Sequence, residues 1–450
     1  MRLPALDRRR AGVLLHFSSL HRALGYGGRE FVDWLAAAGF TLWQFLPVGP
    51  TGIDGSPYWV RSDFAGNTAF LDREELPPLN GAEYDAFMAS SHEWLDDFAL
   101  FEALSAVHRG LPWWDWPVEH RDRDSAGLER TRRELSSELS RIKNEQYAFA
   151  YQFGRLRDYA HSRGVRLFGD LPFYVAPDSV ETWSQRTQFQ LDGSGRATAV
   201  SGVPPDYFSE TGQLWGNPLY AWDAMQRDGF VFWRARVLRQ LERMDVLRID
   251  HFRALAEHWA VPASAQDARS GTWKHTPGAA LLQVLREELQ ELPIVAEDLG
   301  VITPDVDALR KNFRLPGMRV LQFGFDGKGE NPHLPHMHER DSVVYTGTHD
   351  NDTTMGWYRS LSSESREQVD FFLRSSSSEM PYALIRAALG SVGLLAVLPA
   401  QDVLGLGSEA RLNTPATVIG NWSWKLPSGS LTADLARHFA RLNAIYGRKE

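Results

Sequence analysis

The chain has 450 residues, 43% of them hydrophobic, which is enough for a large core in one domain or several. Its formal net charge of −9 at pH 7 argues against a nucleic-acid partner and against an anionic membrane surface, and it suits a neutral substrate. The absence of cysteine excludes disulfides, thiolate nucleophiles and thiolate metal sites.

Eight short apolar segments, each followed by polar residues, are candidate β-strands. Most are continuous apolar runs, which is typical of strands covered on both faces. They span residues 12–17, 41–48, 165–175, 246–252, 294–300, 318–326, 342–350 and 394–402. Helical patterns occur at residues 29–38, 230–244, 278–290, 363–374, 381–391 and 432–446, and another begins at Thr303-Pro304. The alternation predicts an α/β fold, a (β/α)8 TIM barrel.

Two stretches interrupt this alternation. Residues 81–161 are long, charged and helix-patterned, and we expect them to form a helical insertion subdomain packed on the barrel. Residues 190–222 are rich in glycine, proline and aromatic residues. A loop of this length in a compact domain is usually functional, so we expect an active-site lid there. Residues 1–450 would then form a single catalytic domain with these two additions.

The sequence also bears on location and on substrate. The charged start, MRLPALDRRR, is followed by an apolar stretch that covers only residues 12–17, which is short for a signal peptide. No run reaches the roughly 18 apolar residues that a membrane-spanning helix requires, so we expect a cytoplasmic protein. Aromatic residues make up 12% of the chain, and a few of its 16 Trp could pack on the apolar faces of sugar rings while most fill the core.

Acidic residues stand at the carboxyl ends of four predicted strands. Asp170 ends VRLFGD, Asp250 ends VLRID, Glu297 ends IVAE, and Asp350 ends VVYTGTHD. In a (β/α)8 barrel these ends surround one mouth, where active sites lie. Four carboxylates gathered there repel one another and lose hydration, which costs free energy. Such a cluster is therefore expected only where the carboxylates have a function or form ion pairs. Ordinary strand-end capping and a Mg²⁺ site are the two alternatives.

Glycoside cleavage needs acids of this kind, because one carboxylate attacks the anomeric carbon while a second acid protonates the leaving oxygen. Asp250 and Glu297 end consecutive strands, which makes the separation of about 5–5.5 Å found in retaining enzymes plausible. Arg248 shares a strand face with Asp250 and would keep it ionised, whereas Glu297 needs a pKa raised towards neutrality. Asp350 and His349 can bind hydroxyls of the distorted sugar ring.

Three segments carry a family resemblance. LRIDHFRAL, IVAEDLGVIT and YTGTHDNDTTMGWY look like the signature blocks of the amylomaltases, the 4-α-glucanotransferases of glycoside hydrolase family 77 in the α-amylase clan. Further blocks agree, among them GVLLHFSSL, WQFLPVGPTG, GDLPFYVAPDSVETW, SGVPPDYFSETGQLWGNPLY, QDVLGLGSEARLN and GNWSWKLP. Together they run nearly end to end in the family's order, which is more specific than any single motif.

The resemblance implies a role for each of three acids. Its RIDHFR block makes Asp250 the nucleophile and Arg248 its partner. Its AEDLG block makes Glu297 the general acid/base. In the GTHDND block, Asp350 corresponds to the transition-state stabiliser and His349 to a sugar contact.

Further substrate contacts are implied around the mouth. The GDLP block places Asp170 there, and the SPY block places Tyr58 beside the donor sugar. Residues 190–222 resemble a lid that carries aromatic and amide side chains over the mouth. In this sequence those side chains are Tyr207, Phe208, Gln213 and Trp215.

The resemblance also implies the reaction. A 4-α-glucanotransferase moves α-1,4-glucan segments between maltooligosaccharides by a retaining double displacement. The donors would be maltooligosaccharides, starch or glycogen chains, and the acceptor would be glucose or a maltooligosaccharide. No cofactor would be needed. A lid that excludes water from the covalent intermediate would favour transfer. From the residues alone, an α-glucan hydrolase of the α-amylase type is supported nearly as well as a transferase. A catalytically silent glucan-binding barrel is a third alternative, which the presence of both Asp250 and Glu297 argues against.

The sequence departs from the family pattern at several places. HFSSL replaces HPTSL, AGNTAF replaces AGNPxL, and the segment that follows AGN is short. Ile53 stands where some members carry a tyrosine linked to a second glucan site. These changes concern remote parts of a bound chain and the acceptor length, not the catalytic centre.

A metal site is a further alternative. His333, His336 and His338 cluster in NPHLPHMHERD, but their spacing is loose for a preformed site, and Pro332 and Pro335 break any helix that would align them. We therefore expect no metal. We also expect no nucleotide, because no glycine-rich phosphate loop follows a predicted strand.

Overall fold

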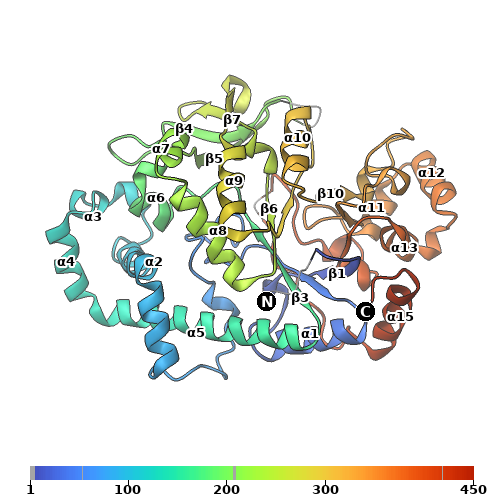
Figure 1. The fold of residues 1–450 in the computed structure, drawn as a ribbon, viewed down its shortest axis with the longest axis horizontal. Coiled ribbons are helices and arrows are strands. Elements are labelled where there is room, and N and C mark those ends of the chain that lie inside the picture. The colour runs from blue at the N-terminus through green and yellow to red at the C-terminus, as the bar shows by residue number, and fades with distance from the viewer. Residues whose placement is uncertain (1–5, 53, 206–208, 418, 450) are drawn as a thin grey trace.

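The computed structural model of the protein describes residues 6–52, 54–205, 209–417 and 419–449. Eight parallel strands form its central sheet, in the order β10-β11-β12-β1-β2-β3-β6-β9. At the junction of the two edge strands, the N–H of Ala296 in β9 donates to the carbonyl of Pro316, just before β10, at 2.9 Å. The sheet is a nearly closed barrel, which confirms the predicted (β/α)8 fold (Figure 1).

A barrel strand overlaps each of the eight predicted segments, although every strand is shorter than the apolar run. Helices cover the outer face and side chains fill the interior, so both faces of each strand are buried. The strands are β1 Arg10–Leu14, β2 Leu42–Gln44, β3 Arg166–Leu171, β6 Val246–Ile249, β9 Ile294–Ala296, β10 Gly317–Val320, β11 Ser342–Tyr345 and β12 Leu395–Pro399.

Helices alternate with the strands and pack on the outside of the barrel. Their amphipathic patterns place apolar side chains against the sheet. They are α1 Tyr26–Ala37, α6 Val180–Ser184, α7 Trp222–Arg227, α8 Val231–Arg243, α9 Gly278–Leu289, α10 Pro304–Asn312, α11 Thr354–Ser360, α12 Ser363–Leu373, α13 Tyr382–Gly390, α14 Ala400–Val403 and α15 Ala433–Ile445. Among the described helices, none combines the length and the apolar character needed to cross a membrane.

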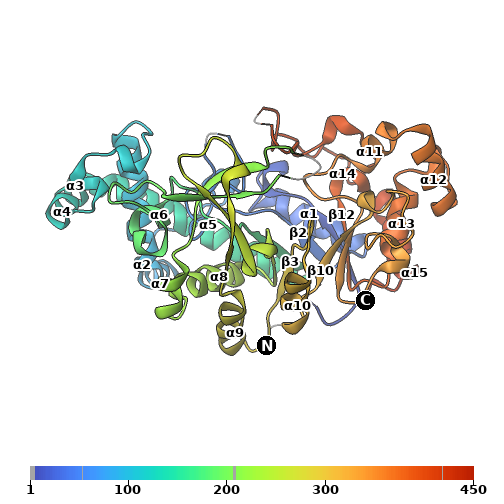
Figure 2. The ribbon, with the colours of Figure 1, turned by 90° about the horizontal axis from the view of Figure 1, so that it is seen from above.

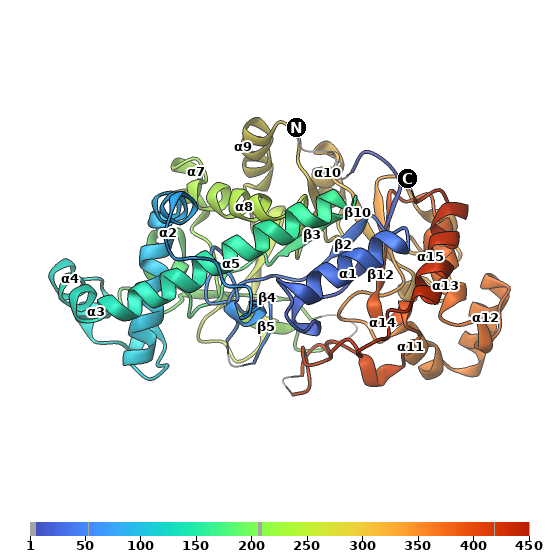
Figure 3. The same ribbon diagram turned by 90° about the horizontal axis from the view of Figure 1, so that it is seen from below.

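Four helices between β2 and β3 form one end of the molecule. They are α2 Ala82–Val107, α3 Val118–Arg121, α4 Ser125–Glu134 and α5 Ser136–Ser162. Phe98, Phe101, Trp116 and Trp183 belong to the apolar cluster that joins these helices to α6. Figure 2 shows α2, α3 and α4 at the opposite end from α12, α13 and α15. Figure 3 shows α5 leading from that end back beneath the barrel, beside α1, with which it makes contact.

A second, antiparallel sheet follows the order β5-β4-β7-β8. β4 Ala199–Val203 and β5 Gln213–Pro218 lie within residues 190–222, and β7 Glu257–Pro262 and β8 Thr272–His275 lie between β6 and α9. The stretch expected to be a loop therefore contains two paired strands. Its glycines led to the loop prediction, but Gly212 and Gly216 have φ values of 67° and 82°. These left-handed conformations let an irregular hairpin form, because glycine has no Cβ to strain them.

Two apolar clusters hold the barrel together. One fills its interior, and the larger one lies between the strands and the helices. Gly169 in β3 shows how closely these layers approach, because a Cβ added there would lie 1.6 Å from Sδ of Met244, directly after α8. Any larger residue at position 169 would therefore displace the side chain of Met244.

The buried Arg236 of α8 forms an ion pair with Asp63, which follows β2, and hydrogen bonds with the loop that follows β3. Arg236 of α8 is fully buried, and its Nε donates to Asp63 Oδ2 at 2.8 Å. Its terminal nitrogens donate to the carbonyls of Pro172 at 2.5 Å and Phe173 at 2.8 Å. Since those carbonyls come directly after Leu171, the last residue of β3, Arg236 fixes the backbone where this strand reaches the mouth.

Asp63→Asn should therefore destabilise the protein, because the guanidinium of Arg236 would stay buried without its counter-ion. Breaking one partner of a buried pair costs about 3–5 kcal/mol. Urea denaturation measures this loss. The matched control is Glu129→Gln, which removes the charge from an exposed pair with Arg133, and such pairs contribute about 0–1 kcal/mol. An equal effect of both substitutions would mean that the carbonyls alone satisfy Arg236.

Candidate active site

Strands β3 and β6 bring three charged side chains to the mouth of the barrel. The strands pair in parallel with Asp170 opposite Arg248. Asp250 lies two residues beyond Arg248 and so points to the same side. The N–H of Asp250 donates to the carbonyl of Leu171 at 3.0 Å, which extends the pairing to the residue after β6.

The guanidinium of Arg248 bridges two carboxylates. Its Nη1 donates to both oxygens of Asp170, at 2.8 and 2.7 Å, and its Nη2 donates to Asp250 Oδ1 at 2.8 Å. Burial alone would lower the pKa of Arg248, but the two carboxylates raise it well above its usual range, so the guanidinium stays charged. The side chain of Asp250 is 31% exposed. Its other oxygen, Oδ2, has no hydrogen-bond partner among the described residues.

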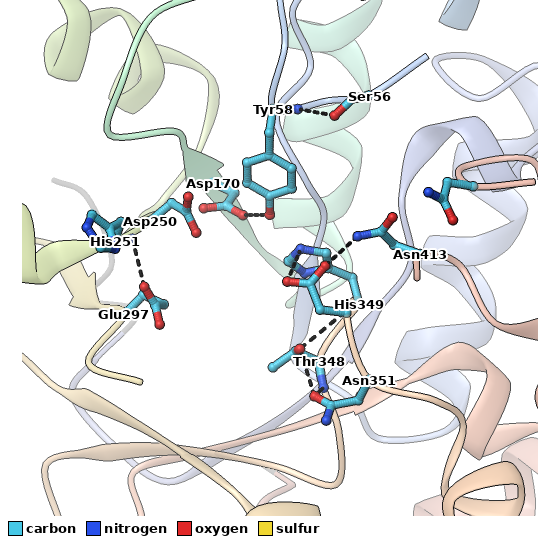
Figure 4. A network of polar contacts seen from close by, with 12 residues as sticks. Ser56, Tyr58, Asp170, Asp250, His251, Glu297, Thr348, His349, Asn351 and Asn413 are labelled. Atoms are coloured by element: carbon cyan, nitrogen blue, oxygen red, sulfur yellow. Dashed lines mark hydrogen bonds and ion pairs between the residues drawn. The ribbon is translucent and has the colours of Figure 1, made fainter. Parts of the chain in front are cut away.

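Main-chain bonds from the end of β6 position Glu297. Its N–H donates to the carbonyl of Ile249, and its own carbonyl accepts from the N–H of Phe252, both at 3.1 Å. Its Oε2 accepts from the N–H of His251 at 2.7 Å, because His251 has a left-handed backbone with φ 49° and ψ 48°. Glu297 is thus bonded to the residue that follows Asp250, and Figure 4 shows the two acids as neighbours.

The two acids have different electrostatic surroundings. Burial raises the pKa of Glu297 to about 8; the negative charge of Asp250 acts in the same direction, while Arg248 opposes it. A proton on Glu297 is therefore retained at neutral pH. One acid with a charged guanidinium beside it and another that holds a proton are the two states that general acid catalysis with a carboxylate nucleophile requires.

Asp350 is held by residues near the carboxyl end of the chain. Its Oδ1 accepts from Asn413 Nδ2 at 2.6 Å, and its carbonyl accepts from Arg411 Nη2 at 2.7 Å. Its Oδ2 lies 3.3 Å from Nε2 of His349, and its side chain is 46% exposed. Asn413 and Arg411 were not among the predicted site residues. The only signal for them was their place in QDVLGLGSEARLN, one of the blocks that carry the family resemblance.

Tyr58 joins the two sides of the site. Its Oη donates to Asp170 Oδ2 at 2.5 Å, and its ring stacks on His349 with centroids 5.2 Å apart and an interplanar angle of 17° (Figure 4). The ring of Trp422, which was not predicted, lies 6.2 Å from that of Tyr58. Tyr58 therefore links the Asp170 and Arg248 pair to the segment that carries Asp350.

Strand β5 contributes two of the predicted contacts. Trp215 lies edge-on to the ring of His251, with centroids 4.7 Å apart, and its Nε1 donates to Gln213 Oε1 at 3.1 Å. An aromatic side chain of β5 thus lies against the residue that follows Asp250. The predicted contacts Tyr207 and Phe208, and Ile53, lie outside the described residues.

The three histidines considered as an alternative metal site have other partners. His333 Nδ1 accepts from the N–H of Val320 at 3.1 Å, His336 Nε2 lies 2.6 Å from the carbonyl of Gly329, and His338 Nδ1 lies 2.7 Å from Ser391 Oγ. Among the residues that the structure describes, no three histidines or carboxylates are arranged to hold a metal ion.

Comparison with known proteins identifies the family. The family model described as 4-alpha-glucanotransferase, glycoside hydrolase family 77, matches residues 15–81 and 73–432. The chain belongs to this family. The 4-alpha-glucanotransferase of Thermus thermophilus is 42% identical, with 96% of this chain and 97% of the relative covered. The chloroplastic/amyloplastic enzyme of Solanum tuberosum is 41% identical over 98% of this chain and 87% of its own. The predicted family resemblance is thereby confirmed.

A solved structure agrees with this family membership. The amylomaltase from Streptococcus agalactiae, determined in complex with acarbose, has a TM-score of 0.93 at 30% identity and covers 98% of this chain and 100% of its own. The amylomaltase from Corynebacterium glutamicum has a TM-score of 0.77 at 17% identity over 99% of this chain and 76% of its own, which supports the fold.

Removing the carboxyl group of Glu297 should change how the stability of the protein depends on pH. The pKa of Glu297 is raised to about 8 in the folded protein and is about 4.3 in an unfolded chain. The folded state therefore holds more protons between these values, and its stability falls as the pH rises through them. Glu297→Gln removes that fall, so the melting temperature of the variant relative to the parent should increase from pH 5 to pH 9.

Glu291→Gln is the control, since Glu291 is exposed and lies in the segment before β9. Its melting temperature relative to the parent should not change with pH. Parallel curves for Glu297→Gln and the parent over the same range would contradict a proton held at Glu297.

Proposed function

We propose that this protein is a retaining 4-α-glucanotransferase that moves α-1,4-glucan segments between maltooligosaccharides by double displacement. The observation that carries the proposal is the contrast between the acids at the ends of β6 and β9. Asp250 is paired with the charged guanidinium of Arg248, whereas Glu297 has a pKa raised to about 8. The family match supports the same activity.

The first displacement breaks the donor chain. Asp250 Oδ2, the oxygen that Arg248 leaves unbound, attacks the anomeric carbon of the donor glucose. Glu297 gives its proton to the glycosidic oxygen, and the bond between that oxygen and the anomeric carbon breaks. The chain on the reducing-end side leaves with a free 4-hydroxyl, and the donor segment stays bound to Asp250 through an ester bond.

The second displacement reverses these movements on an acceptor. Glu297, now ionised, takes the proton from the 4-hydroxyl of glucose or of a maltooligosaccharide. The resulting oxygen attacks the anomeric carbon, the ester bond to Asp250 breaks, and a new α-1,4 bond forms. Two inversions leave the configuration unchanged, and both acids return to their starting protonation states.

The other side chains of the mouth would bind the reacting sugar. Asp350, held by Asn413, offers its half-exposed carboxylate to ring hydroxyls, and His349 lies against it. Tyr58 presents a flat ring that is fixed at its hydroxyl by Asp170. Since these groups are already bonded to the protein, little reorganisation is needed when charge develops in the transition state.

Transfer rather than hydrolysis requires that an acceptor reach the intermediate before water does. We assign this role to the side chains of residues 190–222, where Trp215 lies beside His251 and donates a hydrogen bond to Gln213. Tyr207 and Phe208 belong to the same segment and are proposed to extend this cover. Donors would be maltooligosaccharides, starch or glycogen chains, whose sugar rings can pack on aromatic side chains.

Incubation with maltotriose tests the reaction type. The parent protein should produce glucose together with maltooligosaccharides longer than maltotriose, because every bond broken is re-formed on an acceptor. Chromatography of the products gives the answer, and the number of reducing ends should stay constant. A steady rise in reducing ends would identify a hydrolase of the α-amylase type instead.

The variant Asp250→Asn should lose nearly all of this activity, because the amide is a poor nucleophile. It keeps the shape of the side chain, so its circular dichroism and melting curve serve as the control for folding. Normal turnover by a folded Asp250→Asn variant would remove Asp250 from the mechanism.

The pH dependence of kcat/KM should have an alkaline limb near the pKa of Glu297, about 8. The free enzyme must carry the proton on Glu297, so activity is present below this pKa and is lost as the pH rises through it. Glu297→Gln should reduce turnover of maltotriose by roughly 10²–10⁴-fold.

An activated donor separates the acid role from general damage to the site. An α-maltosyl fluoride needs less proton assistance than a sugar leaving group, so Glu297→Gln should release its first equivalent of fluoride, before Glu297 is needed as a base, at a rate much closer to that of the parent. Equal losses with both donors would assign Glu297 a role other than general acid.

A further inference from the structure

A groove of about 690 Å³ lies on the second sheet, away from the mouth of the barrel, and none of the four predicted acids lines it. One wall is α7. The floor is one face of β4, β7 and β8, where small side chains lie opposite one another, Ala199 across from Pro262 and Ala260 across from Thr272. These small residues leave space that a larger side chain would fill. The volume is within the range of small-molecule sites, about 300–1,000 Å³.

Three charged side chains around the groove have no partners among the residues that the structure describes. Asp223 and Arg227 of α7 and Lys274 of β8 all line it and are exposed, and none of the three makes a hydrogen bond or ion pair with a described residue. Charges of both signs therefore face the same space. An anion would be attracted by Arg227 and Lys274 but repelled by Asp223, whereas hydroxyl groups can bind to all three.

A buried histidine points to a ligand independently of these surface charges. His258 lines the groove but is only 3% exposed, and its Nδ1 is bonded to Thr276 Oγ1 at 2.8 Å. Its Nε2 has no partner among the described residues. Burial, together with the charges of Lys274 and His275, lowers the pKa of His258 to about 4, so the ring is neutral at pH 7. A neutral imidazole nitrogen suits a hydroxyl group, as donor or acceptor.

The same sheet reaches the catalytic mouth. Its edge strand β5 carries Trp215, which contacts His251 beside Asp250, while β4, which pairs with β5, provides part of the groove floor. A polysaccharide long enough to leave the mouth past β5 can therefore continue along the sheet. Small apolar floor residues suit the apolar face of a pyranose ring, and the polar wall suits its hydroxyls.

We propose that this groove binds a segment of an α-glucan chain apart from the catalytic mouth, and so increases the affinity for long chains relative to short ones. This inference rests on the proposed function for the nature of its ligand. The ligand class follows from the mixed charges, the neutral imidazole and the small apolar floor. Binding a second part of one chain raises the apparent affinity because the second contact is intramolecular.

Filling the groove tests the proposal. Ala260→Trp places a large ring on the floor, and Ala263→Trp is the matched control, since Ala263 is exposed and does not line the groove. With amylose as donor, Ala260→Trp should raise KM by about fivefold or more, the effect expected for losing a few weak polar contacts. With maltotriose, both variants should keep the kinetics of the parent. An unchanged KM for amylose would overturn the proposal.

A second variant covers the case in which Ala260→Trp fails to fold or loses both activities. Asp223→Ala combined with Lys274→Ala removes two exposed side chains and should also raise KM for amylose without changing maltotriose kinetics. No change in KM for amylose would overturn the proposal as well.

Affinity electrophoresis in gels that contain amylose measures binding without turnover. The parent and Ala263→Trp should be retarded more than either groove variant. Equal retardation would contradict the proposal that the groove binds an α-glucan. Failure of the parent to transfer maltotriose would instead defeat the proposed function, so the two failures are distinguishable.

Discussion

The buried guanidinium of Arg248 is the constraint on which the site depends. It binds Asp170 on β3 and Asp250 beyond β6, and it is 5% exposed, so neither carboxylate can move without leaving a charge unpaired. Tyr58 extends the same network, since its hydroxyl is bonded to Asp170 and its ring lies on His349. One cation thus ties strands on one side of the mouth to the segment that carries Asp350 on the other.

The surrounding fold holds this network in place through contacts that lie behind it. Arg236 binds the carbonyls just after β3, and Gly169 lets the same strand approach the end of α8. On the β6 side, position is set by main-chain bonds to Glu297. Charges are therefore concentrated at the mouth, and the packing of the barrel beneath it offsets the free-energy cost.

Much of the fold, and the gathering of acids at one mouth of the barrel, could be predicted from the sequence. Apolar runs ending in acids mark barrel strands because strand ends meet at one mouth, and the spacing of Arg248 and Asp250 predicts a shared face. What could not be predicted depends on long-range contacts. Asn413 meets Asp350 across 63 positions of the chain. Residues 190–222 were interpreted as a loop because glycine signals turns, whereas β4 also pairs with β7, a partner that lies elsewhere in the chain.

The bonds between Glu297 and residues 249–252 involve main-chain atoms of the β6 end, whatever side chains stand there. The N–H of His251 would face Glu297 equally well from another residue that tolerates a left-handed backbone, as asparagine does. The imidazole itself is engaged by Trp215. A substitution at position 251 would thus change the contact with Trp215 while the main-chain bond that holds Glu297 beside Asp250 stays the same.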